Sequence, residues 1–260
     1  MSRFKVFLEY QGTRYSGWQI QKNARTVQGE LSAAVGKISA GAKFELYGSG
    51  RTDAGVHAIE QVAHLDLGTA LKPEVLQLKL NEELPSDIHI LRIEPAHPRF
   101  HARHHALSRS YLYQISRRKT AFGKKLVWWI RDELDVRRMK QAAELFVGMK
   151  DFQSFSAADA EETSTRVLVD RVDIAEHGAL ILVRIEGSHF LWNMVRRIVG
   201  VLVEVGRGKL PPDAVRRFLD EKSPEPARLT APPSGLFLER VYYQGDPKLT
   251  TLEPVLRIGG

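Results

Sequence analysis

The sequence contains no cysteine among its 260 residues. This absence excludes disulfide bonds, a thiolate nucleophile and any zinc or iron–sulfur site that needs a cysteine ligand. No apolar run approaches the roughly 20 residues of a membrane-spanning helix, since the apolar run at 198–203 is short and follows two arginines. The first residues also lack the apolar core of a signal peptide. We therefore expect a cytoplasmic protein with no membrane partner.

Acidic residues are missing from one long stretch of the chain. No Asp or Glu lies between Pro95 and Arg131, although the sequence has 31 of them and a net charge of +7. Cations bind phosphates and aromatic rings stack on unpaired bases, so this stretch favours an RNA-facing surface. The alternative is a solvated surface strand, above all at residues 117–119. Its histidines lack the neighbouring acid or cysteine that would complete a zinc site.

Hydrophobic periodicity predicts a mixture of strands and helices along the whole chain. We expect strands at 4–10, 44–47, 62–67, 88–93, 110–116 and 236–243, and a hairpin of 166–176 with 179–186. We expect helices at 27–38 after the cap Thr26, at 73–84, at 136–147 after the cap Asp135, at 190–206, and a short one from 211. The pattern indicates an α+β protein with an N-terminal subdomain, 1–105, and a C-terminal subdomain, 106–260.

The most unusual stretch is residues 48–57, Gly-Ser-Gly-Arg-Thr-Asp-Ala-Gly-Val-His. Its glycines permit close backbone packing and positive φ angles. Asp53 within it is either a plain turn residue or an acid held on a tight loop beside Arg51. In the second case the nearby cation favours the ionised carboxylate, which can act as a nucleophile or stabilise a developing positive charge.

A second candidate lies on the expected helix at 190–206. On a helical wheel, Asn193 and Arg197 belong to the polar stripe, while Arg196 falls at its border with the apolar side. A half-buried arginine needs an acid or a phosphate as its partner, and Asp53 is one such acid. In the alternative, the stem of Arg196 covers apolar surface while its head stays in water.

Several motifs together resemble one family, the TruA-type tRNA pseudouridine synthases. Residues 50–58 (GRTDAGVHA) resemble its signature around a catalytic aspartate, and residues 109–113 (RSYLY) resemble its tyrosine motif. Further similar blocks are 10–12 with 17–19, 81–88, 100–103, 151–155, 190–196 and 231–233 with 235–236. Two positions depart from the family pattern: Gln11 replaces a frequent Asp, and the pair 192–193 replaces polar or His residues.

The resemblance implies the pseudouridine synthase fold, in which two RRM-like, ferredoxin-like α+β halves share an antiparallel sheet with a central active-site cleft. It implies a homodimer that binds the tRNA anticodon arm across both subunits, with no metal and no other cofactor. The implied reaction is the isomerisation of uridine to pseudouridine at positions 38, 39 and 40 of the anticodon stem-loop, after the base has been flipped out of the stack.

The resemblance also assigns roles to single residues. Asp53 is the catalytic nucleophile, and attack at C1′, attack at C6 and removal of a ribose proton all stay open. Tyr111 stacks on the uracil, with relay of the C5 proton left open, although a buried core tyrosine is the alternative from the residues alone. Arg196 pairs with Asp53, and Arg51 helps to hold the flipped nucleotide or the backbone. The implied tRNA contacts are Phe100, His101, Ala102, Arg103 and His104.

Two other classes of protein compete with this interpretation. A non-catalytic RNA-binding protein with two RRM-like halves needs the basic, aromatic surface but not Asp53, and the close-set Gly-Phe runs of an RRM are not apparent. A base-excising glycosidase also uses a carboxylate and base flipping, but it releases the free base. Analysis of the product therefore separates it from a synthase.

Overall fold

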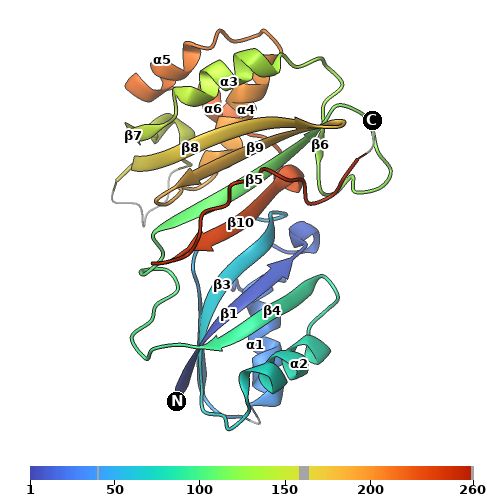
Figure 1. Cartoon of the computed structure of the whole chain (residues 1–260), viewed down its shortest axis with the longest axis vertical. Helices are drawn as coiled ribbons and strands as arrows, with labels where there is room; N and C mark the ends of the chain where they lie inside the picture. Colours follow the sequence, from blue (N-terminus) through green and yellow to red (C-terminus); the bar gives the residue numbers. More distant parts are fainter. Residues whose placement is uncertain (40, 158–163, 259–260) are drawn as a thin grey trace. The chain divides into compact units, whose positions relative to one another are not determined.

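A computed structural model gives the fold for residues 1–39, 41–157 and 164–258 (Figure 1). The chain forms two compact units. The first consists of Met1–Leu107 and Phe237–Asp246, and the second of the described residues of Ser108–Leu236 and Pro247–Gly260. The expected domain boundary between residues 105 and 106 stays a prediction. The mixed α+β class predicted from the sequence is confirmed.

The first unit is a sheet with two helices on one face (Figure 1). Its central strand β1 pairs antiparallel with β3 and β4, so that Val6 lies opposite both Ala63 and Ile93. On β3, β2 pairs antiparallel and β10 pairs parallel. The elements are β1 (Ser2–Tyr10), α1 (Val27–Ile38), β2 (Phe44–Gly48), β3 (His57–Leu67), α2 (Pro73–Glu83), β4 (Ile88–Pro95) and β10 (Leu236–Tyr242).

Local chemistry explains where these elements begin, and one expectation needs correction. Thr26 caps α1 as predicted, because its Oγ1 accepts a hydrogen bond from the Gly29 amide at 3.2 Å. The alternation along residues 4–10 predicts that Phe7 lies with Lys5 and Glu9 on the face away from the core, yet only 4% of Phe7 is exposed. The Arg92 guanidinium lies 3.3 Å from the centre of its ring. The helix-free face of this sheet is therefore covered as well.

The second unit repeats the plan of a sheet with helices on one face (Figure 1). The strands pair antiparallel in the order β5-β9-β8-β7, and β6 pairs parallel with β5. Its strands are β5 (Ser108–Ser116), β6 (Trp128–Trp129), β7 (Gly148–Asp151), β8 (Arg166–His177) and β9 (Leu180–Gly187). Its helices are α3 (Val136–Glu144), α4 (Met194–Gly206), α5 (Ala214–Asp220) and α6 (Glu225–Arg228).

The expected helix at 190–206 begins four residues later than predicted, at Met194. Asn193 directly before it has φ of +63°, a left-handed conformation that ends any helix and that asparagine tolerates better than most residues. Residues 190–193 are therefore a loop. The N-cap of α3 was predicted correctly, since Asp135 accepts from the amides of Arg137 and Arg138 at 2.9 and 3.2 Å, but α3 ends at Glu144, three residues before the expected end.

The sheet face opposite the helices in the second unit is covered by the C-terminal segment 247–258. Backbone groups of this segment bond buried polar side chains of the sheet. Arg184 donates to the Thr251 carbonyl at 2.7 Å, and Gln114 accepts from the Val255 amide at 2.8 Å. Among the described residues, none of the helices has both the length and the apolar character that crossing a bilayer requires.

Candidate functional site

The loop that carries Asp53 joins β2 to β3 and is fixed by backbone hydrogen bonds. The Thr52 carbonyl accepts from the Trp18 amide at 3.0 Å, and the Gly55 amide donates to the Tyr15 carbonyl at 3.2 Å. A turn closes from the Val56 amide to the Asp53 carbonyl at 3.1 Å, with Gly55 at a φ of +79°. Asp53 is half-buried and Arg51 is exposed. The carboxylate thus stands on a backbone held from both sides.

Glycines outside the loop let the chain approach it closely. A Cβ on Gly12 would lie 1.9 Å from the Val56 carbonyl oxygen, and a Cβ on Gly17 would lie 2.5 Å from that of Thr52. Gly48 in turn packs against the Trp18 ring, where a Cβ would come within 2.6 Å. Real side chains do not fit at such distances, so glycine is required at these positions. Segments 12–18 and 48–56 therefore pack closely against each other around Asp53.

A buried polar network lies directly beneath the loop. The Tyr10 hydroxyl bonds the Thr52 hydroxyl at 2.8 Å, and the Gln61 amide lies 3.5 Å from the same Tyr10 oxygen. Gln61 also donates to the Gly50 carbonyl at 3.2 Å and accepts from the Ser49 hydroxyl at 2.6 Å. Burial raises the pKa of Tyr10 to about 12, so its hydroxyl stays protonated. The network links residues on both sides of Arg51 to the sheet.

Tyr111 lies in the second unit, on β5, where it is half-buried. Its ring meets that of Phe190 edge to face, with centroids 5.1 Å apart and planes at 82°. Side chains two residues apart point to the same face of a strand, so Tyr113 shares this face of β5. Tyr113 is fully buried and donates to the Pro232 carbonyl at 2.7 Å.

Arg196 lies in the first turn of α4 and is half-buried, as its position on the wheel predicted. Its Nε donates to the Ala231 carbonyl at 2.7 Å and its Nη1 donates to the Asn193 side chain at 3.0 Å. Burial raises the pKa of Tyr113 well above its usual range, while the charge of Arg196 opposes that rise. Arg196 therefore sits near the face of β5 that carries both tyrosines.

The residues that resemble the family's tRNA contacts form a series of turns at 97–105, in the first unit. Arg103 and His104 are exposed, and Phe100 and His101 are half-buried. Ala102 is fully buried, so its side chain anchors the turns and does not reach the surface. Its amide donates to His64 Nδ1 at 3.2 Å, and its carbonyl accepts from the Tyr243 hydroxyl at 2.7 Å.

Further contacts fasten these turns to the sheet. Arg3 donates to the Phe100 carbonyl at 2.7 Å while it pairs with Asp66. The Lys5 ammonium lies 4.0 Å from the centre of the Tyr243 ring. Burial lowers the pKa of His64 to about 4, helped by the charges of His101 and Arg3 and opposed by Asp66. His64 is therefore neutral at physiological pH, as its accepting Nδ1 requires.

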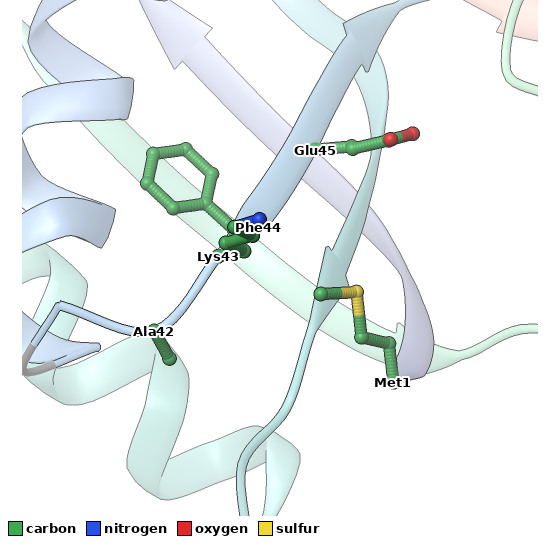
Figure 2. Close-up of a pocket in the computed structure, with 5 residues that line it drawn as sticks. All are labelled: Met1, Ala42, Lys43, Phe44 and Glu45. Carbon is green, nitrogen blue, oxygen red and sulfur yellow. The ribbon is translucent and has the colours of Figure 1, made fainter.

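The described residues form no metal cluster, and a pocket near the N-terminus lies apart from the predicted site residues. Within 1–39, 41–157 and 164–258, no three His, Asp or Glu residues lie close enough together to hold a metal ion. Figure 2 shows a pocket of about 380 Å³ at the start of β2, lined by Met1, Ala42, Lys43, Phe44 and Glu45. None of the predicted site residues lines it.

Sequence reasoning did not single out the support beneath Asp53. Thr52 belongs to the motif at 50–58, but the sequence predicted no role for Tyr10 or Gln61. The available signal was Gln61, a polar residue directly before the expected strand at 62–67. In the second unit, Tyr113 and Phe190 were likewise named only within motifs, although the Phe190 ring contacts that of Tyr111 and the charge of Arg196 acts on the pKa of Tyr113.

Comparison with known proteins identifies the family to which this chain is similar. A family model described as tRNA pseudouridine synthase matches residues 6–104 and 142–244. A Bacillus cereus protein named tRNA pseudouridine synthase A 2 is 37% identical over 94% of this chain and all of its own length. Proteins named tRNA pseudouridine synthase A from Thermoanaerobacter pseudethanolicus and Agrobacterium fabrum are 40% and 39% identical over 94% of this chain, and over 100% and 93% of their own.

One solved structure was also compared. A chain from the crystal structure of a Cbf5–Nop10–Gar1 complex is 12% identical over 76% of this chain and 54% of that chain. Its TM-score is 0.31. This likeness is too weak to carry an argument.

Proposed function

Because the chain belongs to the tRNA pseudouridine synthase family, an isomerase family that acts on uridine, we propose that it converts uridine to pseudouridine in the anticodon stem-loop of tRNA. The observation that carries the proposal is the Asp53 loop, a half-buried carboxylate on a backbone bonded from both sides. The names of the relatives support tRNA as the substrate. The resemblance of residues 50–58 and 100–103 to family motifs supports positions 38, 39 and 40.

The proposed chemistry needs a carboxylate and no cofactor. The N1–C1′ bond breaks, the uracil turns, and a C5–C1′ bond forms; the C5 hydrogen leaves to solvent while N1 gains a proton. Asp53 acts as the nucleophile that carries the reaction through bond cleavage. Its fixed backbone supports this role, because a reaction is faster when the reacting group is oriented before the substrate binds.

Tyr111 and Arg196 have supporting roles in the proposal. Tyr111 stacks on the flipped uracil, and its ring is oriented for this by the edge-to-face contact with Phe190. The guanidinium of Arg196 is oriented by its bonds to Ala231 and Asn193. Arg196 keeps the catalytic carboxylate ionised, and this pairing with Asp53 stays a prediction from the resemblance.

Binding must supply the free energy that base flipping consumes, which is a few kcal/mol for a paired nucleotide. The exposed cations Arg51 and Arg103 provide phosphate contacts in the proposal, with His104 next to Arg103 in the chain. Phe100, His101 and Ala102 set the shape of the turns. A homodimer that shares one tRNA, and a cytoplasmic location where tRNA is modified, complete the proposal on the strength of the resemblance.

The proposal is tested by mapping the product in unmodified tRNA transcripts. After incubation with the protein, carbodiimide labelling and primer extension locate each pseudouridine, and nucleoside analysis measures free uracil. We expect stops at positions 38, 39 or 40 and no free uracil. Pseudouridine at other positions refutes the anticodon assignment, free uracil identifies a glycosidase, and tight binding without either product identifies a non-catalytic RNA-binding protein.

A further inference from the structure

The loop of residues 117–127, here called the basic loop, has a fixed base. It leaves β5 after Ser116, where the Arg117 amide donates to the Ala179 carbonyl at 2.9 Å. At its other end the Leu126 carbonyl accepts from the fully buried Gln114 side chain at 2.9 Å. Strand β6 then pairs with β5. The loop is therefore a supported projection from the sheet of the second unit.

The tip of the basic loop presents a phenylalanine to solvent. Phe122 is 86% exposed, the largest exposure of any large apolar side chain in the described part of the chain. Its carbonyl accepts from the Thr120 hydroxyl at 2.7 Å, and the Leu126 amide bonds the Gly123 carbonyl at 2.7 Å. Gly123 has a φ of +72°, and a Cβ there would lie 2.0 Å from Leu256. Turn geometry and packing thus hold the ring outward.

Basic residues flank Phe122 on both sides in the sequence. The basic loop contains Arg117, Arg118, Lys119, Lys124 and Lys125 and no acidic residue. Arg117 is paired with Glu176, and the Lys119 ammonium lies 5.7 Å from the centre of the Trp129 ring. Within the described residues, neither Lys119 nor Lys124 forms an ion pair. An exposed aromatic ring can stack on an unpaired base, and the flanking cations can bind phosphates. The basic loop therefore offers both kinds of contact that single-stranded RNA makes.

A comparison within the chain distinguishes this surface from an ordinary exposed one. Leu78 and Lys79 on α2 also combine an exposed apolar side chain, 61% for Leu78, with a lysine. That helix, however, carries Glu74, Glu82 and Glu83. The acids of α2 repel phosphates, whereas the basic loop attracts them.

We propose that the basic loop binds an unpaired nucleotide of the tRNA, with Phe122 stacked on its base and Lys119 and Lys124 against the flanking phosphates. This inference rests on the proposed function and adds a tRNA contact that the family motifs do not include. Loss of one stacking ring weakens single-strand binding by about 5- to 100-fold. Loss of one phosphate contact lowers the slope of log Kd against log salt by roughly 0.7–0.9.

The test measures Kd for a full-length unmodified tRNA transcript by fluorescence anisotropy at several salt concentrations. Phe122→Ala is compared with Phe122→Trp, which keeps a stacking ring, and the double variant Lys119→Gln/Lys124→Gln isolates the charges. Leu78→Ala and Lys79→Gln are the matched controls on α2. We expect Phe122→Ala to raise Kd at least fivefold, Phe122→Trp to restore it, and the double glutamine variant to lower the salt slope by about 1–2.

A Kd for Phe122→Ala within twofold of the wild type overturns the inference, provided that circular dichroism shows an unchanged fold. Sedimentation at the same concentrations tests whether Phe122 instead mediates a contact between copies of the chain. If Phe122→Ala changes the oligomeric mass, the ring forms such a contact and the inference is wrong. Wild-type protein that neither binds nor modifies tRNA refutes the proposed function itself. Normal wild-type binding and modification with a neutral Phe122→Ala refutes only the loop assignment.

Discussion

The bond between Tyr10 and Thr52 beneath the Asp53 loop gives a quantitative prediction. Thr52→Val keeps the shape of the side chain but replaces its hydroxyl by a methyl group. The buried Tyr10 hydroxyl then loses its partner at 2.8 Å and keeps only the Gln61 amide at 3.5 Å. A buried hydroxyl left without a good partner costs about 1–3 kcal/mol. The single variant should lower the free energy of unfolding by this amount.

Tyr10→Phe leaves the opposite group, the buried Thr52 hydroxyl, without its partner. The double variant removes both hydroxyls together, and replacing both partners of a buried bond by apolar groups is nearly neutral. The sum of the two single losses should therefore exceed the loss of the double variant by at least about 2 kcal/mol. Because Asp53 follows Thr52 directly, Thr52→Val should also lower turnover, by up to about a hundredfold for a displacement near 1 Å.

Urea unfolding of the four proteins, followed by circular dichroism, gives the free energies of unfolding for this cycle. Tritium release from tRNA labelled at uracil C5 gives the turnover of the same four samples. Strictly additive losses of stability would show that the hydroxyls do not interact. Unchanged turnover in Thr52→Val would show that the network does not position Asp53.

Three further predictions concern packing, pH and salt. Gly12→Ala should lower the free energy of unfolding by about 1–3 kcal/mol, because its Cβ would lie 1.9 Å from the Val56 carbonyl oxygen. Gly36→Ala on α1, where nothing lies within 4 Å of the added Cβ, should raise the free energy of unfolding by about 0.5–1 kcal/mol. Equal effects of the two variants in urea unfolding would contradict this prediction. The pKa of His64 is about 4 in the folded protein, against an ordinary value of 6.5. Between these two pH values the imidazole is protonated in the unfolded chain but not in the folded one. The free energy of unfolding should therefore fall by on the order of 3 kcal/mol as the pH drops through that range. His64→Gln should flatten this dependence, and an unchanged slope refutes the assignment. The tRNA Kd should rise steeply with salt, by roughly 0.7–0.9 in log–log slope per neutralised phosphate, and a flat response excludes the basic surface.

Local sequence signals predicted the elements whose ends depend on a single side chain. The caps at Thr26 and Asp135 are where the pattern placed them, and the hairpin turn lies at 178–179, one residue beyond the expected 177–178. The same signals failed where the backbone conformation decides. Asn193 delays α4 to Met194, and a left-handed residue leaves no mark in hydrophobic periodicity. The two-residue strand β6 is too short for any periodic signal.

The candidate site shows the same division between local and tertiary information. The motif around Asp53 identified the carboxylate, but its support comes from Tyr10, Gly12 and Gly17, which are distant in sequence. Ala102 appeared as one member of a contact motif, yet it is fully buried, and its carbonyl accepts from Tyr243, which lies near the far end of the chain. Such pairings depend on strand order, and β10 reaches β3 only through tertiary folding.

The central claim is that the carboxylate of Asp53 performs the isomerisation. Its most direct test follows tritium release from C5 of uridine in unmodified tRNA with wild-type protein and with Asp53→Asn, alongside the tRNA Kd of each. Asparagine keeps the size of the side chain but cannot act as a nucleophile. We expect release with the wild type, no release with Asp53→Asn, and Kd values within a few-fold of each other. Release by Asp53→Asn at a rate near that of the wild type would contradict the account.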